Sequence, residues 1–422
     1  MARSERPGPT VTLVEARHQL LAELELLEPR RRGLDEALGC VLAEEVMARE
    51  DVPPFANSAM DGFAVRAEDA RMATARLHLV GAVTAGGVAA DPLGPGEAMA
   101  IATGAPLPKG ADAVCMVERT TVEGTEVILE TAVEVGENVR YPGEDVARGS
   151  SVFVPTTVLR SSHIGVLASI GVSEVSVHPR ARVGVVSTGD ELSSGTGPLQ
   201  YGQIHDSNRR ALLAAARSAG CDAVDLGVVG DDERAIAEAI EGGVGRCDAI
   251  LTSGGVSVGV ADHMKTVLGR LSGGSVHWME VAIKPAKPFG FAVLAPSGVP
   301  VLCMPGNPVS AMVSFELLAR PALRFMMGHR ALDRPALSAT TEDRLVRRRD
   351  GKLHFVRVVA RVDAEGNLWV RPSGGQGSHQ LRSLAEANAL AVLPDGEGVD
   401  AGQRVRILLV DPDAVLGTEV PS

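Results

Sequence analysis

The sequence has few aromatic residues and little clustered positive charge. Aromatics make up 3% of the 422 residues, whereas 45% of residues are hydrophobic. The cores must therefore be built from Val, Leu, Ile and Ala. The formal net charge is −12, and the two short arginine runs, at 30–32 and 347–349, are expected to be solvated surface turns. This balance argues against a nucleic-acid-binding surface.

Cysteine is scarce and scattered, and long apolar runs are missing. None of the five cysteines forms a C-x-x-C pair, so we expect small buried side chains and neither a zinc site nor a disulfide framework. No apolar run approaches 18 residues, and no basic segment leads into an apolar one near the N-terminus. We therefore expect neither a membrane span nor export, and a cytoplasmic location is the default.

The common nucleotide-binding motifs are also missing. Residues 184–189 have the glycine spacing of a Walker A loop, but Asp190 and Glu191 stand where a lysine and a hydroxyl residue are required. No G-x-G-x-x-G opens a helix after the first strand of this region. P-loop and dinucleotide-binding functions are therefore disfavoured.

The chain is long enough for several domains. Apolar spacing predicts helices over 13–27 and 34–42, and the prolines at 53 and 54 mark a boundary. Short strands broken by glycine predict a small β domain over 51–145. The stretch 146–181 is expected to pack back against the first helices. The β domain would then be an insertion in a discontinuous domain formed by 1–50 and 146–181.

The region 182–327 alternates apolar strands with amphipathic helices, which predicts a mostly parallel α/β sheet covered on both faces. Strands are expected at 183–187, 223–229, 249–252, 276–283, 289–294 and 301–304, and helices at 209–219, 233–243, 263–271 and 309–326. Strands at 353–362, 368–371, 389–393 and 404–410 predict a separate small β domain over 328–422. The predicted fold class is α/β plus β, in several domains.

Small polar residues follow three of these strands, where α/β folds bind ligands. Backbone amides in such loops, with a helix N-terminus behind them and hydroxyls beside them, bind anions, and phosphate is the expected group. An ordinary turn with a helix cap explains any single loop, but less readily three at one sheet edge. The candidates are Ser187, Thr188 and Gly189; Ser253, Gly254, Gly255 and Ser257; and Pro305, Gly306, Asn307 and Ser310.

Carboxylates accompany these loops. They repel phosphate unless a cation intervenes, so a Mg²⁺ site is predicted. Helix capping is the alternative for Asp231 and Asp262. The candidate ligands or partners of the metal are Asp190, Glu191, Asp231 and Asp262.

Lys284 and Lys287 lie three residues apart in a segment that its prolines keep extended, so both could reach an anion; a surface turn is the alternative. In the N-terminal half, Asp61 lies in an unusual loop of small residues. Polar segments around Thr103 and at 140–145 follow apolar runs, although a β-turn explains either of them alone.

Together these segments resemble the molybdopterin molybdenumtransferase family, including the homologous C-terminal domain of gephyrin, over nearly the whole chain. The resemblance rests on the segments 53–55, 58–62, 103–106, 143–145, 187–192, 206–208, 253–259, 284–288 and 305–308. It implies that 182–327 is a molybdopterin-binding domain. An elongated discontinuous domain, the inserted β domain and a C-terminal β-barrel-like domain would flank it.

The resemblance implies insertion of molybdate into the dithiolene of adenylated molybdopterin, with divalent-cation-dependent release of AMP. It also implies a homodimer whose cleft joins the loops of one subunit to the inserted domain of the other. Asp61, Thr103, Glu191 and Asp145 would then be the catalytic residues. Arg140 would bind substrate with the strand-end loops, and Arg140 or the lysines are candidates to hold molybdate. A transient contact with the molybdopterin adenylyltransferase is a further expectation.

Two positions depart from the family pattern. Ala56 stands where many members have an acidic or amide residue, and Ala286 replaces the usual glycine, which puts a positive φ there in doubt. Two other functions remain open. A molybdopterin adenylyltransferase shares the α/β domain but is typically that domain alone, and a gephyrin-like scaffold would need no catalysis.

Overall fold

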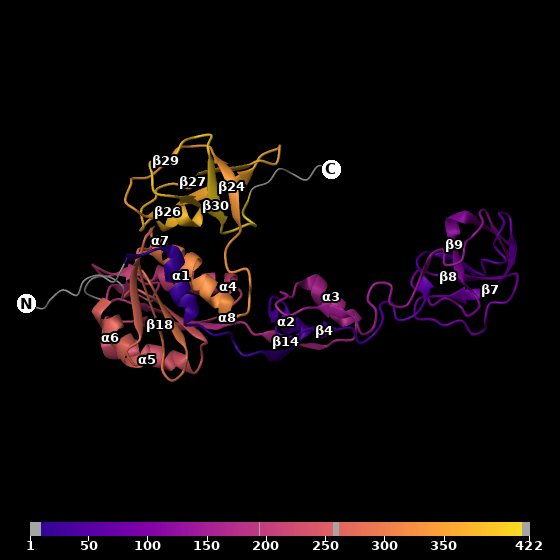
Figure 1. Ribbon diagram of the computed structural model, residues 1–422, viewed down its shortest axis with the longest axis horizontal. Helices are drawn as coiled ribbons and strands as arrows, with labels where there is room; N and C mark the ends of the chain where they lie inside the picture. The colour runs from indigo at the N-terminus through magenta and orange to yellow at the C-terminus, as the bar shows by residue number, and fades with distance from the viewer. Residues whose placement is uncertain (1–9, 194, 256–260, 416–422) are drawn as a thin grey trace, which may run out of the picture. The chain divides into compact units, whose positions relative to one another are not determined.

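The computed structural model describes residues 10–193, 195–255 and 261–415, and the chain divides into two compact units (Figure 1). The first unit comprises the described residues of Met1–Arg30 and His178–Ser422, and the second comprises Arg31–Val177. Each unit is described in turn.

A seven-stranded sheet forms the centre of the first unit. Its strands lie in the order β1 (Thr10–Val11), β20 (Val276–Val281), β22 (Pro288–Val293), β23 (Pro300–Met304), β19 (Ala249–Ser253), β15 (Arg182–Thr188) and β18 (Asp222–Val229). All neighbours pair in parallel except at β22, which is antiparallel to β20 and to β23. The predicted mostly parallel sheet is confirmed.

Helices cover both faces of this sheet, as predicted (Figure 1). Successive strand residues point to opposite faces, so Leu251 packs in one apolar core and Ile250 in the other. The first core includes side chains of α1 (Leu13–Ala22), α4 (Ser207–Ser218), α7 (Pro308–Ser314), the π-helical segment η2 (Phe315–Ala319) and α8 (Arg320–Met326). The second includes side chains of α5 (Glu233–Val244) and α6 (Ala261–Leu271).

The first helix belongs to this unit. Thr12 and Glu15 form a reciprocal capping box at the N-terminus of α1, and Ala16 and Leu20 are buried in the α/β core. The helix ends at Ala22, short of the predicted end at 27, because Leu27 donates its backbone N–H to the Met326 carbonyl at the end of α8. The described residues from Thr10 to Arg30 thus lie with the α/β unit, which differs from the predicted grouping of 1–50 with 146–181.

The helix predicted over 309–326 is interrupted by one π turn. Pro321 has no N–H to donate and its ring crowds the carbonyl four residues earlier. The chain widens before it: the Arg320 N–H donates to the Phe315 carbonyl, five residues back. The helix therefore continues past the proline with α8 instead of ending.

The C-terminal strands of this unit close into a five-stranded barrel (Figure 1). The strands are β24 (Ala336–Thr341), β26 (Leu353–Val362), β27 (Leu368–Pro372), β28 (Ala389–Leu393) and β30 (Arg404–Leu409). A short helix, α9 (Leu381–Ala385), and a two-stranded ribbon of β25 (Leu345–Val346) with β29 (Gly398–Val399) accompany them. Val358, Val370 and Ile407 fill the interior. The predicted barrel-like domain is confirmed.

The barrel is joined to the central sheet by the chain segment that follows β20. The strand predicted over 276–283 ends as β20 at Val281, and β21 (Ile283–Lys284) then pairs in parallel with β26 of the barrel. The predicted strand is divided because its first part pairs with β22 of the central sheet and its last residues pair with β26 of the barrel. As a result, Lys284 lies in register with His354.

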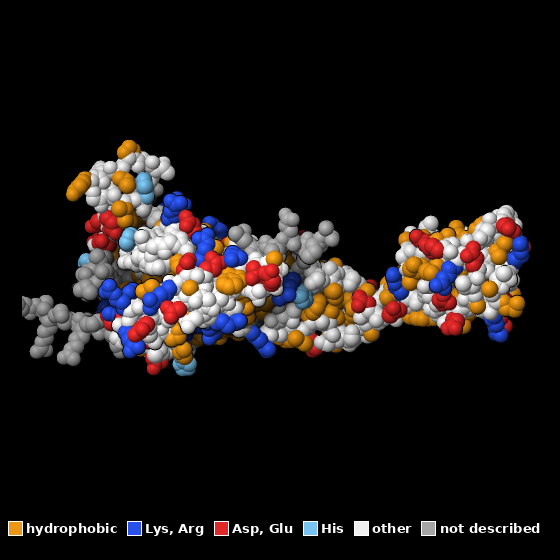
Figure 2. All heavy atoms as spheres, turned by 90° about the horizontal axis from the view of Figure 1, so that it is seen from above, with side chains coloured by type: hydrophobic (Ala, Val, Ile, Leu, Met, Phe, Trp, Pro, Cys, Tyr) orange, Lys and Arg blue, Asp and Glu red, His pale blue; other side chains and the backbone are white. Residues whose placement is uncertain are grey.

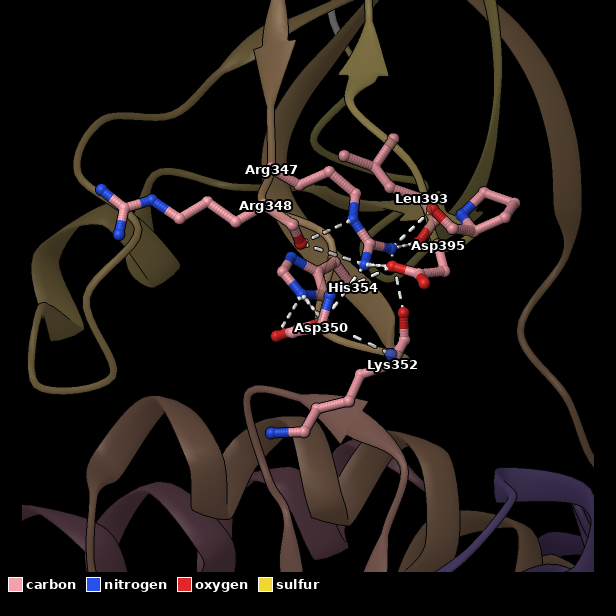
Figure 3. A network of polar contacts seen from close by, with 8 residues as sticks. Arg347, Arg348, Asp350, Lys352, His354, Leu393 and Asp395 are labelled. Atoms are coloured by element: carbon pink, nitrogen blue, oxygen red, sulfur yellow. Dashed lines mark hydrogen bonds and ion pairs between the residues drawn. The ribbon is translucent and has the colours of Figure 1, made fainter.

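The expectation that residues 347–349 form a solvated turn is wrong for Arg347, whose side chain is fully buried (Figure 3). Its guanidinium donates to the Leu393 carbonyl at 2.9 Å and the Lys352 carbonyl at 2.9 Å, and it pairs with Asp350 and Asp395. Carbonyls and carboxylates together offset the desolvation of the charge. Arg347 therefore fixes the hairpin that leads into β26.

A six-stranded sheet forms one part of the second unit, as the predicted β domain required. Its strands lie in the order β10 (Thr120–Glu123), β11 (Glu126–Leu129), β7 (Arg76–Val83), β8 (Glu97–Ile101), β6 (Gly62–Val65) and β9 (Ala113–Met116), and the 3₁₀ turn η1 (Val117–Arg119) follows β9. The small pair β5 (Asn57–Ser58) and β12 (Val139–Arg140) borders it. Phe63, Val65 and Leu129 are buried in its core.

The other part of the second unit is small. It contains β2 (Arg30–Gly33), β3 (Val41–Leu42) and β14 (Glu174–His178) in one sheet, the pair β4 (Val46–Met47) and β13 (Ser151–Phe153), and the helices α2 (Leu34–Ala37) and α3 (Ser161–Ser169). The helix predicted over 34–42 is only one turn long, because Leu42 and Cys40 instead bond to the backbone of Thr157 and Leu159. The part of the stretch 146–181 that lies in this unit, up to Val177, packs against α2, β3 and β4, whereas the first helix, α1, belongs to the other unit.

Surface charge is mixed on both units. The arginine run 30–32 forms β2 rather than a turn, and exposed Arg31 pairs with Glu44. Figure 2 shows acidic and basic side chains interspersed over the face of each unit that it displays. All five cysteines are buried, as predicted. None of the helices in the described part of the chain is long and apolar enough to cross a membrane.

His329 should make the stability of the first unit depend on pH. Burial, with Arg324 and Arg320 nearby, lowers the pKa of His329 to about 4, and its Nδ1 accepts a hydrogen bond from Arg324 at 3.2 Å. The unfolded chain binds this proton near the ordinary His pKa of about 6.5, so stability is lost as the pH falls from there towards 4. We expect a loss of about 2 kcal/mol between about pH 7.5 and pH 5.

The measurement is denaturant unfolding at both pH values for the wild type and for His329→Gln, which keeps an acceptor but does not titrate. The variant should show a correspondingly smaller loss. Equal losses in the two proteins would contradict the role given to His329.

Candidate functional site

The strand register brings the predicted polar loops of the first unit to one sheet edge. Ser187 at the end of β15 lies opposite Ser253 at the end of β19, and Ser253 lies opposite Met304 at the end of β23. Thr188 lies opposite Val229 at the end of β18. The loops that follow these four strands therefore leave the sheet side by side, as parallel strands require.

Two of these loops touch because one residue has no side chain. Gly254 has φ +96°, and a Cβ built on it would lie 2.5 Å from the Thr188 carbonyl oxygen. Its N–H donates to the Met304 carbonyl at 3.2 Å. Thr188 is buried, and its Oγ1 has no hydrogen-bond partner among the described residues. A hydroxyl at the loop junction is thus free to bond a ligand.

Asn208, which the sequence had placed in a motif but not in the site, bridges two of the loops. Its Nδ2 donates to Ser253 Oγ at 2.8 Å and to the Gly306 carbonyl at 2.7 Å. Asn208 lies in the first turn of α4, which Asp206 caps, and Asp206 also accepts from Ser187 Oγ at 3.0 Å. A capping Asp directly before a predicted helix, with Asn208 two residues later, was the available signal.

The third loop meets the barrel. Pro305 is buried, whereas Gly306 and Asn307 are exposed ahead of α7. The Val309 N–H donates to the Ser378 carbonyl of a barrel loop at 3.1 Å, and neighbouring Ser310 is buried. The barrel therefore fixes the backbone of this loop.

The predicted acidic residues of the first unit gather at the same edge. Asp190 Oδ1 accepts the Asp231 N–H at 3.0 Å, and the carboxylate of Glu191 folds back over Gly189, whose missing Cβ would lie 2.5 Å from it. Asp231 Oδ1 is buried with no hydrogen-bond partner among the described residues. Capping does not explain Asp231, since Asp232 caps α5.

The described residues do not form a finished metal cage at this edge. Within them no group of three or more His, Cys, Asp or Glu side chains is placed to hold a metal ion. Ser257 and the side chain of Asp262 lie outside the described residues. The unpartnered oxygen of Asp231 nevertheless fits Mg²⁺, which commonly takes one or two protein carboxylates and completes its shell with water and substrate phosphates.

The lysine segment reaches the same edge from the antiparallel side of the sheet. β22 runs antiparallel to β23, with Gly290 opposite Cys303, so β22 begins at the edge where β23 ends. Glu280 near the end of β20 lies opposite Pro288 at the start of β22. Residues 284–287, which connect the two strands, therefore lie at this edge. Lys284 is exposed, whereas Lys287 pairs with Glu280 at 2.7 Å. Ala286 is buried and has φ +79°. The positive φ that alanine had put in doubt is therefore present, at a conformational cost of about 1 kcal/mol.

In the second unit, Asp61 and Thr103 form a pair. Asp61 Oδ1 accepts the Thr103 N–H at 2.7 Å and its hydroxyl at 2.9 Å. These two hydrogen bonds, the backbone one first, lower the pKa of Asp61. Asp61 is exposed and ionised, so it presents a fixed negative charge.

Arg140 and Asp145 line a cavity of the second unit with a volume of about 480 Å³. The other lining residues are Val52, Pro53, Asn57 and Glu144. Arg140 reaches the Ala59 carbonyl at 3.5 Å, and Asn57 is buried. Asp61 and Thr103 do not line this cavity, so the four predicted residues of this unit form two separate groups.

Three family models match consecutive parts of the chain. Residues 11–171 match the MoeA N-terminal region (domain I and II), residues 184–324 match a probable molybdopterin binding domain, and residues 342–410 match the MoeA C-terminal region (domain IV). The matched parts include both units.

Relatives and a solved structure match over nearly the whole chain. The chain is 35% identical to the molybdopterin molybdenumtransferase of Haemophilus influenzae, over 94% of this chain and 98% of that protein. It is 38% identical to molybdopterin molybdenumtransferase 2 of Mycobacterium tuberculosis, over 93% and 98%. A crystal structure of the molybdopterin biosynthesis MoeA protein from Pyrococcus horikoshii has a TM-score of 0.78 and 30% identity, over 95% of this chain and 100% of that one. The chain therefore belongs to the molybdopterin molybdenumtransferase family.

Proposed function

We propose that this chain joins molybdate to the dithiolene of adenylated molybdopterin and releases AMP, as a step of molybdenum cofactor biosynthesis. The observation that carries the proposal is that relatives named for this activity match more than nine-tenths of the chain. The loops at the sheet edge supply the groups that a pyrophosphate-containing substrate needs.

The strand-end loops of the first unit bind the pterin nucleotide. The amides of the glycine-rich loops, with the hydroxyls of Thr188 and Ser253, donate to its phosphates. The Ser187 hydroxyl donates to Asp206 and contributes by holding the loops in place. Lys284 adds a cation at this edge. Lys287 is partly neutralised by Glu280 and contributes less charge. Asn208 and Asp206 position the loops, so the donors are in place before the substrate arrives.

Asp231, with Asp190 and Glu191, would hold Mg²⁺ beside these phosphates. When bound, this ion supplies the positive charge that offsets phosphates and carboxylates at one edge. The unpartnered buried oxygen of Asp231 supports this assignment.

Asp61, Thr103, Asp145 and Arg140 complete the reaction site from the second unit in this proposal. We place the protein in the cytoplasm as a homodimer with a site shared between subunits, and we keep a transient contact with the adenylyltransferase as part of the proposal. An adenylyltransferase function is disfavoured, because relatives matched at full length bear the other name. No particular observation favours a scaffold.

The reaction is tested by incubating the full chain with adenylated molybdopterin, molybdate and Mg²⁺ and measuring AMP by chromatography. AMP should appear with molybdenum cofactor that reactivates a cofactor-free molybdoenzyme. If the chain instead consumed ATP with metal-free molybdopterin and left the adenylated form intact, the adenylyltransferase assignment would replace ours.

Glu191→Ala and Asp61→Ala should each slow AMP release about 100-fold or more, because each removes a fixed charge from the reaction site. Neither carboxylate is buried, so the unfolding midpoint should stay within about 3 °C of the wild type. The measurement pairs single-turnover AMP release with thermal unfolding.

Glu241→Ala is the matched control, because this carboxylate is exposed on α5, outside the proposed site. It should release AMP at the wild-type rate. Normal turnover in both site variants would refute the roles of Glu191 and Asp61.

A further inference from the structure

The cavity of the second unit has a lining that suits neither of the charged ligands of the reaction. Arg140 brings one positive charge, and Glu144 and Asp145 bring two negative ones. Two carboxylates repel an oxyanion such as molybdate, which the sequence had assigned to Arg140 as one alternative, and the guanidinium repels a divalent cation. A neutral ligand with donors on one edge and an acceptor beside them avoids both repulsions and can pair with a carboxylate and with the guanidinium.

Two acceptors in this cavity are unused. Asn57 is 6% exposed, and its Oδ1 is buried with no hydrogen-bond partner in the described part of the chain, although its Nδ2 contacts the Phe55 carbonyl at 3.4 Å. The carboxylate of Asp145 likewise has no partner among the described residues. Asp145 is held there by its backbone N–H, which donates to the Val52 carbonyl at 2.9 Å. A buried unpaired amide oxygen is destabilising unless a ligand pairs it.

The third acceptor is already engaged. Glu144 Oε2 accepts the Tyr141 N–H at 2.9 Å, which ties this carboxylate to its own turn. Arg140 contacts the Ala59 carbonyl with one nitrogen, at 3.5 Å, and among the described residues its other N–H groups have no partner, which leaves them for a ligand. The usable polar groups are therefore a carboxylate, an amide oxygen and a guanidinium.

We infer that this cavity binds the 2-amino-4-oxo edge of the substrate's pterin ring, an assignment that rests on the proposed function. This edge carries an N3–H and a 2-amino group, three hydrogens in all, next to the O4 acceptor. The Asp145 carboxylate accepts from N3–H and one amino hydrogen, Asn57 Oδ1 accepts the second amino hydrogen, and Arg140 donates to O4. Val52 and Pro53 supply apolar wall for the ring face.

This assignment divides substrate recognition by chemistry. The glycine-rich loops of the first unit keep the phosphates, which need amides and cations. The second unit reads the heterocycle, which needs a carboxylate paired with two neighbouring N–H groups. Asp145 then acts as a specificity residue that distinguishes a 2-amino ring from a 2-oxo ring.

The test uses two free ring compounds, pterin with a 2-amino group and lumazine with a 2-oxo group and an added hydrogen on N1. Binding to the full chain is measured by quenching of their fluorescence. The wild type should prefer pterin. Asp145→Asn should bind pterin about tenfold or more weakly, because an amide accepts one N–H where the carboxylate accepts two. Its Nδ2 can donate to the 2-oxo group of lumazine, so the preference should shift towards lumazine.

Glu144→Gln is the matched control, because it neutralises the other carboxylate of the same cavity, which serves the Tyr141 N–H. It should keep the wild-type preference. An equal change in both variants would mean that cavity charge alone matters, and absence of saturable pterin binding by the wild type at about 1 mM would overturn the assignment. Guanosine, which has the same donor edge, serves as a further probe, and tighter binding of guanosine than of pterin would assign the cavity to a guanine nucleotide.

Failure of this inference and failure of the proposed function can be told apart. Binding of free pterin needs neither molybdate nor AMP release, so a protein that binds pterin through Asp145 but releases no AMP would count against the reaction alone. Conversely, AMP release with an unchanged KM for adenylated molybdopterin in Asp145→Asn would count against the cavity alone.

Discussion

The close approach of the loops after β15 and β19 is the constraint on which the first unit's site depends. Gly254 lies so near the Thr188 carbonyl that any Cβ would collide with it. This contact aligns the start of the loop after β15 with the start of the loop after β19. Asn208 then links Ser253 to the Gly306 carbonyl in the loop after β23. Because backbone amides are fixed by covalent geometry and register, donors built this way need little reorganisation when an anion binds.

The second constraint is electrostatic. A site rich in carboxylates can hold phosphates only if a cation is present or if the carboxylates accept hydrogen bonds from protein donors. Asp190 accepts the Asp231 N–H and Asp61 accepts from Thr103, whereas one buried oxygen of Asp231 has no partner among the residues that the structure describes. The same reasoning, applied to the mixed charges that line the cavity of the second unit, is the basis for proposing a neutral heterocycle there. In each place, the proposed ligand is the one whose chemistry pairs with these atoms.

The sequence predicted the α/β sheet and its polar edge because continuous apolar strands and glycine-rich strand ends are local signals. It mispredicted features set by distant partners. Residues 24–27 leave the helical path to bond with α8, Arg347 is buried because barrel carbonyls surround it, and the strand expected over 276–283 divides between two sheets. In the site, it placed the acids and hydroxyls but missed the bridging role of Asn208, which depends on two loops far away in the chain.

The division of that strand also explains an apparent misfit at Ala286. Residue 283 must leave the central sheet to pair with β26, while residue 288 must re-enter it as β22. Four residues therefore reverse the chain between two fixed strands, and one of them takes a positive φ although it carries a Cβ. Strand pairing on both sides fixes the path of the turn. Ala286 therefore keeps a positive φ at a conformational penalty of about 1 kcal/mol, a conformation that alanine does not favour by itself. The barrel thus acts on the site directly, because its pairing with β21 sets where Lys284 lies at the sheet edge.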